Sequence, residues 1–269
     1  MPVTKFLFWN INRKPLAGLV AELAEIHRVD VIILAECIMT PGTLLRALNR
    51  DDPVFHFPEA RSRRLAILTR FPREFLEECF HDERVSIRRL TLPRRMPILL
   101  AATHLPSKPH WNAASLAVEC SELAKNIENE EQVAGHRRTI LVGDFNLNPF
   151  DEGLAGGLSS VMSRRVASRT TRTVQGREYR FFYNPMWNHF GDASSETAGS
   201  YYYNAAQHVN HYWNIFDQVL LRPELAEYFD PAQVSIIKRI GSRSLVRQDG
   251  RPDRDSGSDH LPLLFAVEF

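Results

Sequence analysis

The sequence contains few cysteines and no long hydrophobic run. Its cysteines, Cys37, Cys79 and Cys120, are odd in number and lack CxxC spacing, which excludes a disulfide framework and a zinc knuckle. The longest apolar runs, at residues 97–103 and 261–267, are too short to span a bilayer. The amino-terminal residues also lack the pattern of a signal peptide. We therefore expect a cytoplasmic protein that does not enter a membrane.

The sequence also lacks a large net charge and any segment that resembles a linker. The 33 Lys+Arg against 32 Asp+Glu give a formal net charge of +1, so the average charge does not indicate a nucleic-acid partner. No internal repeat, low-complexity stretch or Pro/Gly/Ser linker divides the chain. A chain of 269 residues that is 44% hydrophobic can bury a large core. We expect a single domain over residues 1–269.

What the sequence does contain is a series of short apolar runs with β-branched or aromatic residues. These runs predict strands at residues 3–11, 31–35, 65–69, 85–92, 98–103, 139–142, 216–221, 234–237 and 261–267. Helical spacing occurs at residues 15–28, where Pro15 suits the first turn, and at residues 112–131, which Asn112 could cap. Because strands outnumber the helices interleaved with them, the fold class is α/β or α+β with a sheet-rich core.

Polar residues gather at the ends of the predicted strands. At carboxyl ends lie Asn10, Asn12, Glu36, His104, Asp144 and Asn146, and at amino ends of later strands lie Asp217, Asp259 and His260. If the later strands run antiparallel to the earlier ones, all of these residues share one edge of the core. Any single Asp or Asn there is more often a turn former or a helix cap. The joint pattern favours a site.

Six segments resemble, in order, the signature blocks of the endonuclease/exonuclease/phosphatase superfamily, also called the DNase I-like fold. They are FWNIN (8–12), ILAE (33–36), THLPS (103–107), GDFNLNP (143–149), FDQVLL (216–221) and SDHLPL (258–263). The resemblance covers nearly the whole chain. It implies a four-layer α/β sandwich of two mixed β-sheets flanked by helices. It also implies a metal-dependent phosphoesterase that uses Mg²⁺ or Mn²⁺.

The resemblance assigns the metal site and the attacking water to particular residues. Glu36 is expected to be the main metal ligand, with Asn12 and Asp259 completing the site directly or through water; hard oxygen ligands are what Mg²⁺ prefers. Asp144 is expected to orient or deprotonate the attacking water. Asn146 would hold this water or a phosphate oxygen.

The remaining catalytic roles fall to histidines and their partners. By the resemblance, His260 contacts the scissile phosphate, Asp217 fixes the tautomer and charge of His260, and Asn10 donates hydrogen bonds in the pocket floor. His104 stands where DNase-like and phosphatase-like members have histidine, which argues against an abasic-site endonuclease. In the DNase branch this second histidine pairs with a carboxylate, for which Glu83 is the candidate.

Basic and aromatic segments indicate the substrate. Residues 164–180 contain six arginines and one acid, and residues 238–254 contain six cations and two acids, as suits a polyanionic backbone if these are not merely solvated loops. Aromatic residues at 180–190, 200–204 and 211–213 could stack on unpaired bases, or the rings of Tyr201 to Tyr203 could pack into the core. The predicted substrate contacts are Arg177, Arg180, Tyr202 and Trp213.

The sequence thus favours a nuclease or DNA-end-processing phosphodiesterase that uses in-line attack of water, with DNA favoured over RNA as substrate. One alternative is a phosphoesterase acting on inositol phosphates, phospholipid headgroups or another small phosphoester. Another is a non-catalytic binding module that retains the fold; the completeness of the polar set speaks against it. Nothing in the sequence indicates an obligate protein partner.

Overall fold

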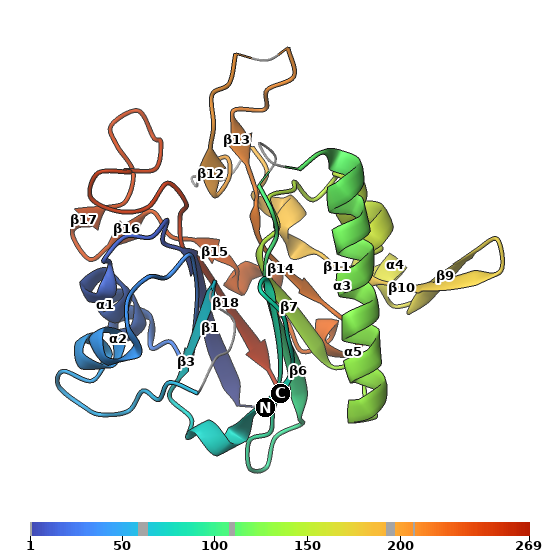
Figure 1. Ribbon diagram of the computed structural model, residues 1–269, viewed down its shortest axis with the longest axis horizontal. Coiled ribbons are helices and arrows are strands. Elements are labelled where there is room, and N and C mark those ends of the chain that lie inside the picture. The colour runs from blue at the N-terminus through green and yellow to red at the C-terminus, as the bar shows by residue number, and fades with distance from the viewer. Residues whose placement is uncertain (1, 59–63, 108–110, 192–196, 207) are drawn as a thin grey trace.

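The computed structural model describes residues 2–58, 64–107, 111–191, 197–206 and 208–269. Two large sheets organise this part of the chain (Figure 1). The five-stranded sheet has the order β15-β18-β1-β2-β3, with β1 (Val3–Asn10), β2 (Val31–Ala35), β3 (Leu65–Thr69), β15 (Ser235–Ile236) and β18 (Leu263–Glu268). The seven-stranded sheet has the order β4-β5-β6-β7-β14-β11-β8, with β4 (Leu76–His81), β5 (Val85–Leu90), β6 (Ile98–His104), β7 (Thr139–Asp144), β8 (Ser160–Val161), β11 (Phe182–Tyr183) and β14 (Asp217–Leu221).

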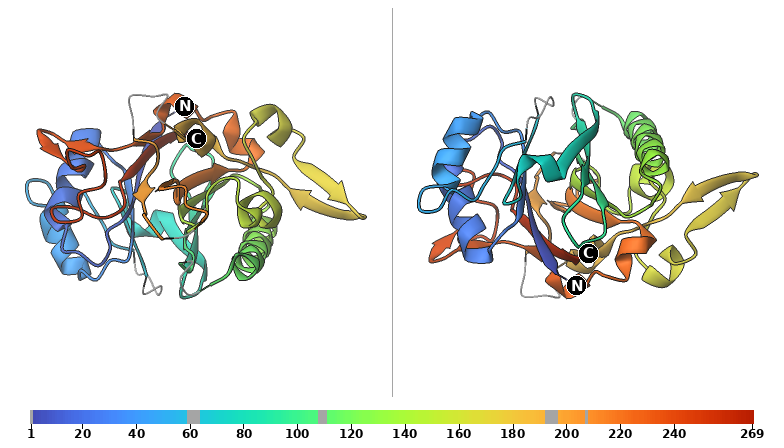
Figure 2. Two further views of the ribbon diagram at one scale, coloured as in Figure 1. Left: turned by 90° about the horizontal axis from the view of Figure 1, so that it is seen from above. Right: turned by 90° about the horizontal axis from the view of Figure 1, so that it is seen from below.

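Helices cover the outer faces of the two sheets. On one side lie α1 (Ala17–His27) and α2 (Pro41–Leu48), and on the other lies α3 (Ala113–Ala134), as Figures 1 and 2 show. Strand β6 illustrates the layering: Leu100 and Ala102 belong to the core shared by the two sheets, whereas Leu99 and Ala101 pack in the cluster with α3. This alternation follows from the period of two in a strand. The predicted four-layer α/β sandwich is confirmed.

Short elements complete the structure. They are α4 (Arg164–Ala167), α5 (Pro223–Ala226), 3₁₀ turns at Arg73–Phe75, Pro185–His189 and Pro231–Gln233, a π turn at Gly153–Gly157, and the two-stranded pairs β9 (Thr171–Val174) with β10 (Arg177–Arg180), β12 (Tyr201–Tyr202) with β13 (Trp213–Asn214), and β16 (Arg239–Ile240) with β17 (Arg243–Ser244). None of the described helices is long and apolar enough to cross a membrane.

Strand direction brings the predicted site residues to one edge. Strand β1 runs parallel to β2, and β6 runs parallel to β7, so their carboxyl ends lie together. Strand β14 is antiparallel to β7, and β18 is antiparallel to β1. Asp144 is therefore the register partner of both His104 and Asp217. The later strands thus run antiparallel to the earlier ones, which was the condition for the predicted site residues to share one edge.

The helix ends agree with the sequence at one place and differ at another. Asn112 caps α3 by accepting a hydrogen bond from the backbone N–H of Ser115. The expectation that Pro15 occupies the first turn of α1 was wrong, because the helix begins at Ala17 and the chain before it forms a turn in which the Leu16 N–H bonds to the Lys14 carbonyl. Helix α2, which the apolar spacing did not reveal, is capped by Thr40 and has Pro41 at its start.

Gly143 allows β7 to lie close to β6 immediately before Asp144. A Cβ at this position would collide with the carbonyl oxygen of Thr103 on β6. We expect Gly143→Ala to lower the free energy of unfolding by about 3 kcal/mol, since the strands must separate. Urea denaturation measures this change. In the control Gly156→Ala the added Cβ has nothing within 4 Å, so it should change stability by less than about 0.5 kcal/mol; equal stability of the two variants would contradict the prediction.

Candidate active site

A cavity of about 350 Å³ opens at the edge where these strand ends meet. It contains eight of the nine predicted catalytic and metal-site residues: Asn10, Asn12, Glu36, His104, Asp144, Asn146, Asp259 and His260. The ninth, Asp217, is fully buried behind His260. Residues that are far apart in sequence therefore line a single concave site.

Asp144 lies at the centre of the hydrogen bonds in this cavity. Its Oδ2 accepts a hydrogen bond of 2.9 Å from Asn10 Nδ2, and its Oδ1 accepts one of 2.9 Å from the backbone N–H of Asn146. The Nε2 atoms of His104 and His260 each lie 3.8 Å from Oδ2. Asp144 is buried, so these neighbours fix its orientation. This carboxylate is positioned to hold a small polar group between the two imidazoles.

His260 is held by groups on several sides. Its Nδ1–H donates to Asp217 Oδ2 at 2.8 Å, and its carbonyl accepts a bond of 2.9 Å from Trp9 Nε1. Burial alone would lower the pKa of His260, but the carboxylates of Asp217 and Asp144 and the hydrogen bond to Asp217 raise it to about 10. The imidazole is therefore protonated near neutral pH and presents a charged Nε2–H donor.

His104 has a different electrostatic environment. Its Nε2 lies 3.5 Å from Glu36 Oε1 and 3.8 Å from Asp144 Oδ2. Burial lowers the pKa of His104, and the positive charges of His260 and Arg84 lower it further, against the raising effect of Asp144 and Glu36, so the neutral ring is favoured near neutral pH. The pairing with Glu83 was wrong, because the exposed Glu83 carboxylate bonds to Arg64 Nε at 2.8 Å. Beside His104 lies instead Arg84, whose backbone carbonyl accepts the His104 N–H.

Three of the nine predicted catalytic and metal-site residues have a left-handed backbone. The φ angles are 47° at Asn12, 50° at Glu36 and 51° at Asn146. Asparagine tolerates this region, but a glutamate there is uncommon and costs conformational energy. Such strain persists where the surrounding structure requires it. In this cavity it aims the Glu36 side chain at His104 Nε2 and Arg13 Nε, both at 3.5 Å.

The donors in the cavity suit a hard divalent cation. Glu36, Asp144 and Asp259 supply carboxylate oxygens, and Asn12 supplies an amide oxygen. Ligand atoms of Asp144, Asp217 and His260 also lie within 4.8 Å of one another in the described part of the chain. In that group, however, Asp217 Oδ2 and His260 Nδ1 bond to each other at 2.8 Å. We therefore consider Glu36 and the accessible oxygens of the cavity the better match for Mg²⁺ or Mn²⁺.

The predicted substrate contacts lie elsewhere. Arg177 and Arg180 belong to the β9–β10 hairpin, which projects past α3 and away from the cavity (Figures 1 and 2). Arg180 instead faces Glu178 and Glu128, at 3.5 and 3.9 Å. Arg177 and Arg180, predicted to contact the substrate, therefore do not line this cavity. Tyr202 and Trp213 pair across β12 and β13, beside the cavity but not in its lining.

Sequence reasoning missed several residues of the lining, namely Arg13, Arg64, Arg84, Pro106, Ser107, Trp111 and Tyr201. Arg13 directly follows Asn12, and Pro106 and Ser107 end the block that begins before His104, so adjacency to a motif could have indicated them. Tyr201 belongs to the aromatic segment 200–204, but the sequence did not indicate that it would contact a catalytic residue. It reaches His260 through an isolated antiparallel bridge, and the two ring centroids are 4.5 Å apart.

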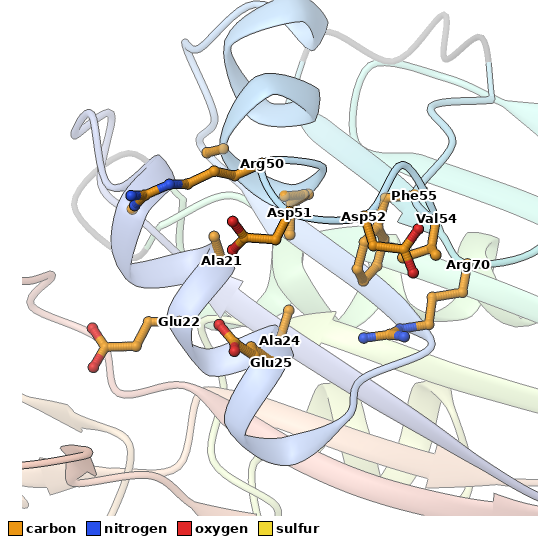
Figure 3. A pocket seen from close by; sticks show the side chains of 13 residues that line it. Ala21, Glu22, Ala24, Glu25, Arg50, Asp51, Asp52, Val54, Phe55 and Arg70 are labelled. Atoms are coloured by element: carbon orange, nitrogen blue, oxygen red, sulfur yellow. The ribbon is translucent and has the colours of Figure 1, made fainter.

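A second cavity, of about 570 Å³, lies between α1 and α2 (Figure 3). It is larger than the first, and its lining combines the acidic Glu22, Glu25, Asp51 and Asp52 with Arg50 and Arg70. It contains none of the predicted catalytic residues. The clustered imidazoles, amides and carboxylates of the first cavity identify that one as the candidate active site.

Two mixed sheets between helices, with this polar set where their strands end, define a DNase I-like protein. The chain belongs to the Endonuclease/Exonuclease/phosphatase family, whose model matches residues 7–260. Membership of this family points to a phosphodiester hydrolase of the nuclease type, and family members generally use divalent metals. The comparison with curated proteins found no match to this sequence.

Solved structures share the fold over the whole chain. A structure of D. rerio TDP2 complexed with single strand DNA product has 15% identity and a TM-score of 0.59, with 100% of each chain covered. The human Nocturnin catalytic domain with bound sulfate has 16% identity and a TM-score of 0.59, covering 100% of this chain and 95% of that one. A family protein from Bacteroides thetaiotaomicron has 10% identity and a TM-score of 0.62, covering 99% and 95%. At these identities the likeness concerns the fold.

Proposed function

We propose that the protein is a metal-dependent phosphodiesterase that hydrolyses nucleic-acid strands by in-line attack of water, with DNA favoured over RNA. One observation carries the proposal: Asp144, bonded to Asn10 and Asn146, lies 3.8 Å from the Nε2 atoms of both His104 and His260 in a cavity lined by further carboxylates. Hydrolysis of a phosphodiester needs a positioned water, donors for the developing negative charge and a cation. The cavity offers groups for each of these needs.

In this proposal each residue has one task. Asp144 orients the attacking water and accepts its proton, and Asn146 holds the water or a phosphate oxygen. His260 donates from Nε2 to the scissile phosphate, while Asp217 keeps it protonated. Asn10 fixes Asp144 from the pocket floor. His104, as a neutral imidazole beside Asp144, offers a second hydrogen-bonding group to the phosphate.

The metal would be held by Glu36, with Asn12 and Asp259 completing its surroundings. A bound Mg²⁺ or Mn²⁺ would supply charge stabilisation at the phosphate oxygens. The protein's own contribution is to keep the oxygens of the cavity oriented, which the left-handed backbone at Glu36 and Asn12 supports.

Nucleic acid as the substrate is supported by the neighbouring folds and by the aromatic residues near the cavity. One fold neighbour is named as a complex with single strand DNA, and another as the endonuclease domain of a telomere-specific retrotransposon. Tyr202 and Trp213, whose ring centroids are 5.4 Å apart, are proposed to contact the strand.

We further propose that residues 1–269 act as one domain, since buried residues of both sheets join in one cluster. Three free cysteine thiols support a reducing compartment such as the cytoplasm.

The proposal is tested by hydrolysis assays on several phosphoesters. Purified protein with Mg²⁺ or Mn²⁺ is incubated with single-stranded DNA, duplex DNA, plasmid and RNA, and release of acid-soluble nucleotides is measured. We expect metal-dependent release that EDTA abolishes. Hydrolysis of a phosphoinositide with no cleavage of any nucleic acid would reject the proposed substrate. If none of these phosphoesters is hydrolysed, the proposal that the protein is a phosphodiesterase is rejected.

Removing the charge of Glu36 tests the metal site. We expect Glu36→Gln to raise the Mg²⁺ concentration needed for half-maximal activity by at least about 10-fold, since an amide is a poorer ligand than a carboxylate. Mn²⁺ binding, followed by electron paramagnetic resonance, should weaken in parallel. The control Glu22→Gln makes the same change in the cavity between α1 and α2 and should alter neither measurement. Unchanged Mn²⁺ binding in Glu36→Gln would place the ion elsewhere.

A further inference from the structure

Beside the catalytic cavity lies a smaller one, of about 260 Å³, with an aromatic and basic lining. Tyr202, Tyr203 and Asn204 line it from β12 and the residues that follow, and Arg247, Arg251 and Arg254 line it from the loop that precedes Ser258. None of its described lining residues is acidic. The catalytic cavity, in contrast, contains three carboxylates. We call the smaller one the aromatic–arginine cavity.

A column of aromatic rings connects the two cavities. Tyr201 lines the catalytic cavity, and its ring centroid lies 4.5 Å from that of His260. Tyr203, which directly follows β12, is nearly parallel to Tyr201, with the centroids 6.4 Å and the planes 16° apart. Tyr203 is 46% exposed. The column therefore begins at the catalytic histidine and ends in a ring face open to solvent.

The arginines are held in place around these rings. The guanidinium of Arg251 lies 4.3 Å from the centroid of the Tyr202 ring, and Arg254 Nη2 donates to the Tyr202 carbonyl at 3.3 Å. Lys14 donates to the carbonyls of Arg254 and Gly257, which ties this loop to the segment that follows Asn12. These contacts fix both the loop and the strand next to the catalytic cavity.

The charges of the three arginines differ in how far they are neutralised. Arg247 pairs with Asp255 at 2.7 Å, and Arg251 pairs with Asp249 at 3.5 Å. Within the described residues, no carboxylate lies within ion-pair distance of Arg254. An exposed guanidinium without a carboxylate partner, held beside stacked tyrosines, is suited to bind a phosphate through two N–H donors.

We propose that the aromatic–arginine cavity binds the nucleotide adjacent to the scissile phosphodiester of a single strand, with its base on the Tyr203 ring and its phosphate on Arg254. The inference rests on the proposed hydrolysis of nucleic-acid strands. The cavity would select single strands, because bases in a duplex already stack on their neighbours and leave no face for a tyrosine. The cavity volume is slightly below the ~300–1,000 Å³ of pockets that enclose a whole small ligand, as suits one unit of a longer chain.

The test measures binding of a fluorescent hexathymidylate by anisotropy in EDTA, where the strand stays intact. We expect Tyr203→Ala and Arg254→Gln each to weaken binding on the order of 10-fold. Arg254→Gln should also reduce the slope of log affinity against log salt by about 0.7, the value for one lost phosphate contact on a single strand. Tyr203→Phe, which keeps the ring, should restore binding. The control Arg46→Gln removes an exposed charge from α2 and should change neither affinity nor slope.

The outcomes separate this inference from the proposed function. Affinity in Tyr203→Ala and Arg254→Gln equal to that in Arg46→Gln would overturn the inference. Equal weakening of a hairpin duplex and of the single strand by Tyr203→Ala would overturn the selection of unpaired bases. If the strand binds and binding depends on Arg254, but no strand is cleaved with metal present, the proposed role of the cavity stands and the proposed hydrolysis is rejected. Cleavage with an unchanged KM in both variants would retain hydrolysis and reject the cavity.

Discussion

Replacing Asp144 by asparagine should lower turnover of a nucleic-acid strand by about 10³-fold or more. A positioned general base contributes roughly 10²–10⁴-fold, and the amide cannot accept a proton in this way. The change also disturbs the hydrogen bonds, since Asn10 Nδ2 donates to Asp144 Oδ2 and would face either the amide nitrogen or a displaced oxygen. The measurement is kcat on single-stranded DNA at saturating Mg²⁺.

The same variant must be shown to fold. Circular dichroism and urea denaturation give this information, and a lost hydrolysis rate with a folded chain supports a role in the reaction. The matched control is Asp230→Asn, where the exposed side chain caps a 3₁₀ turn by accepting from the Ala232 N–H and an amide oxygen can do the same. Turnover of Asp144→Asn within a factor of ten of the unsubstituted protein would remove Asp144 from the proposed mechanism.

The second large effect concerns stability rather than activity. Arg222, whose side chain is 2% exposed, donates from Nε to Glu131 Oε1 at 2.8 Å and from Nη1 to the carbonyls of Arg180 and Phe181. Its guanidinium also lies 3.9 Å from the centroid of the Phe182 ring. We expect Arg222→Met to lower the free energy of unfolding by about 3–5 kcal/mol, because it leaves the carboxylate of Glu131 buried without its cation.

A double substitution shows whether the lone charge causes this loss. Arg222→Met combined with Glu131→Leu removes both charges, and we expect it to recover most of the stability, since apolar pairs of similar volume often replace buried ion pairs without loss. Urea denaturation of the single and double variants gives the two values. A double variant that is as unstable as Arg222→Met would show that the hydrogen bonds to the carbonyls, rather than the ion pair, carry the effect.

The two histidines show how the surroundings divide one residue type into two roles. Both have Nε2 atoms 3.8 Å from Asp144 Oδ2. Only His260 has a fully buried carboxylate bonded to its Nδ1, and this partner raises its pKa, whereas burial lowers the pKa of His104. The Nδ1 atom of His104 has no hydrogen-bond partner in the described structure. One ring is thus suited to remain charged and donate a hydrogen bond, and the other to remain uncharged.

Much of the fold could be predicted from local pattern. Apolar runs with β-branched residues marked β1, β2, β3, β5, β6, β7, β14, β15 and β18, because buried strands need them. Short or amphipathic elements escaped: the pattern of β4 is mixed, with exposed and half-buried residues, and β12 and β13 have two residues each. For elements this short, hydrogen-bonded partners far away in the sequence determine the structure.

The candidate site could be predicted to a similar extent, and the limits have a similar cause. Residues directly at strand ends, such as Glu36 and Asp144, lie close together because the directions of the paired strands bring these ends to one edge of the sheets. Glu83 was assigned from its position before a strand, yet its side chain turned toward Arg64. The arginines of segment 164–180 were near a motif in the sequence but fold away from it on a projecting hairpin.

The sequence by itself determined the strands, the family and the residues that end those strands, because runs of apolar, β-branched residues and the motif residues that follow them are local properties of the chain. Tertiary structure alone decided that Glu36, rather than Glu83, accompanies His104, and it placed Arg254 and Tyr203, rather than Arg177 and Arg180, beside the catalytic cavity. The path of a loop depends on what it packs against. A bond such as that between His260 and Asp217, 43 residues apart, forms only after the sheets have brought its two partners together.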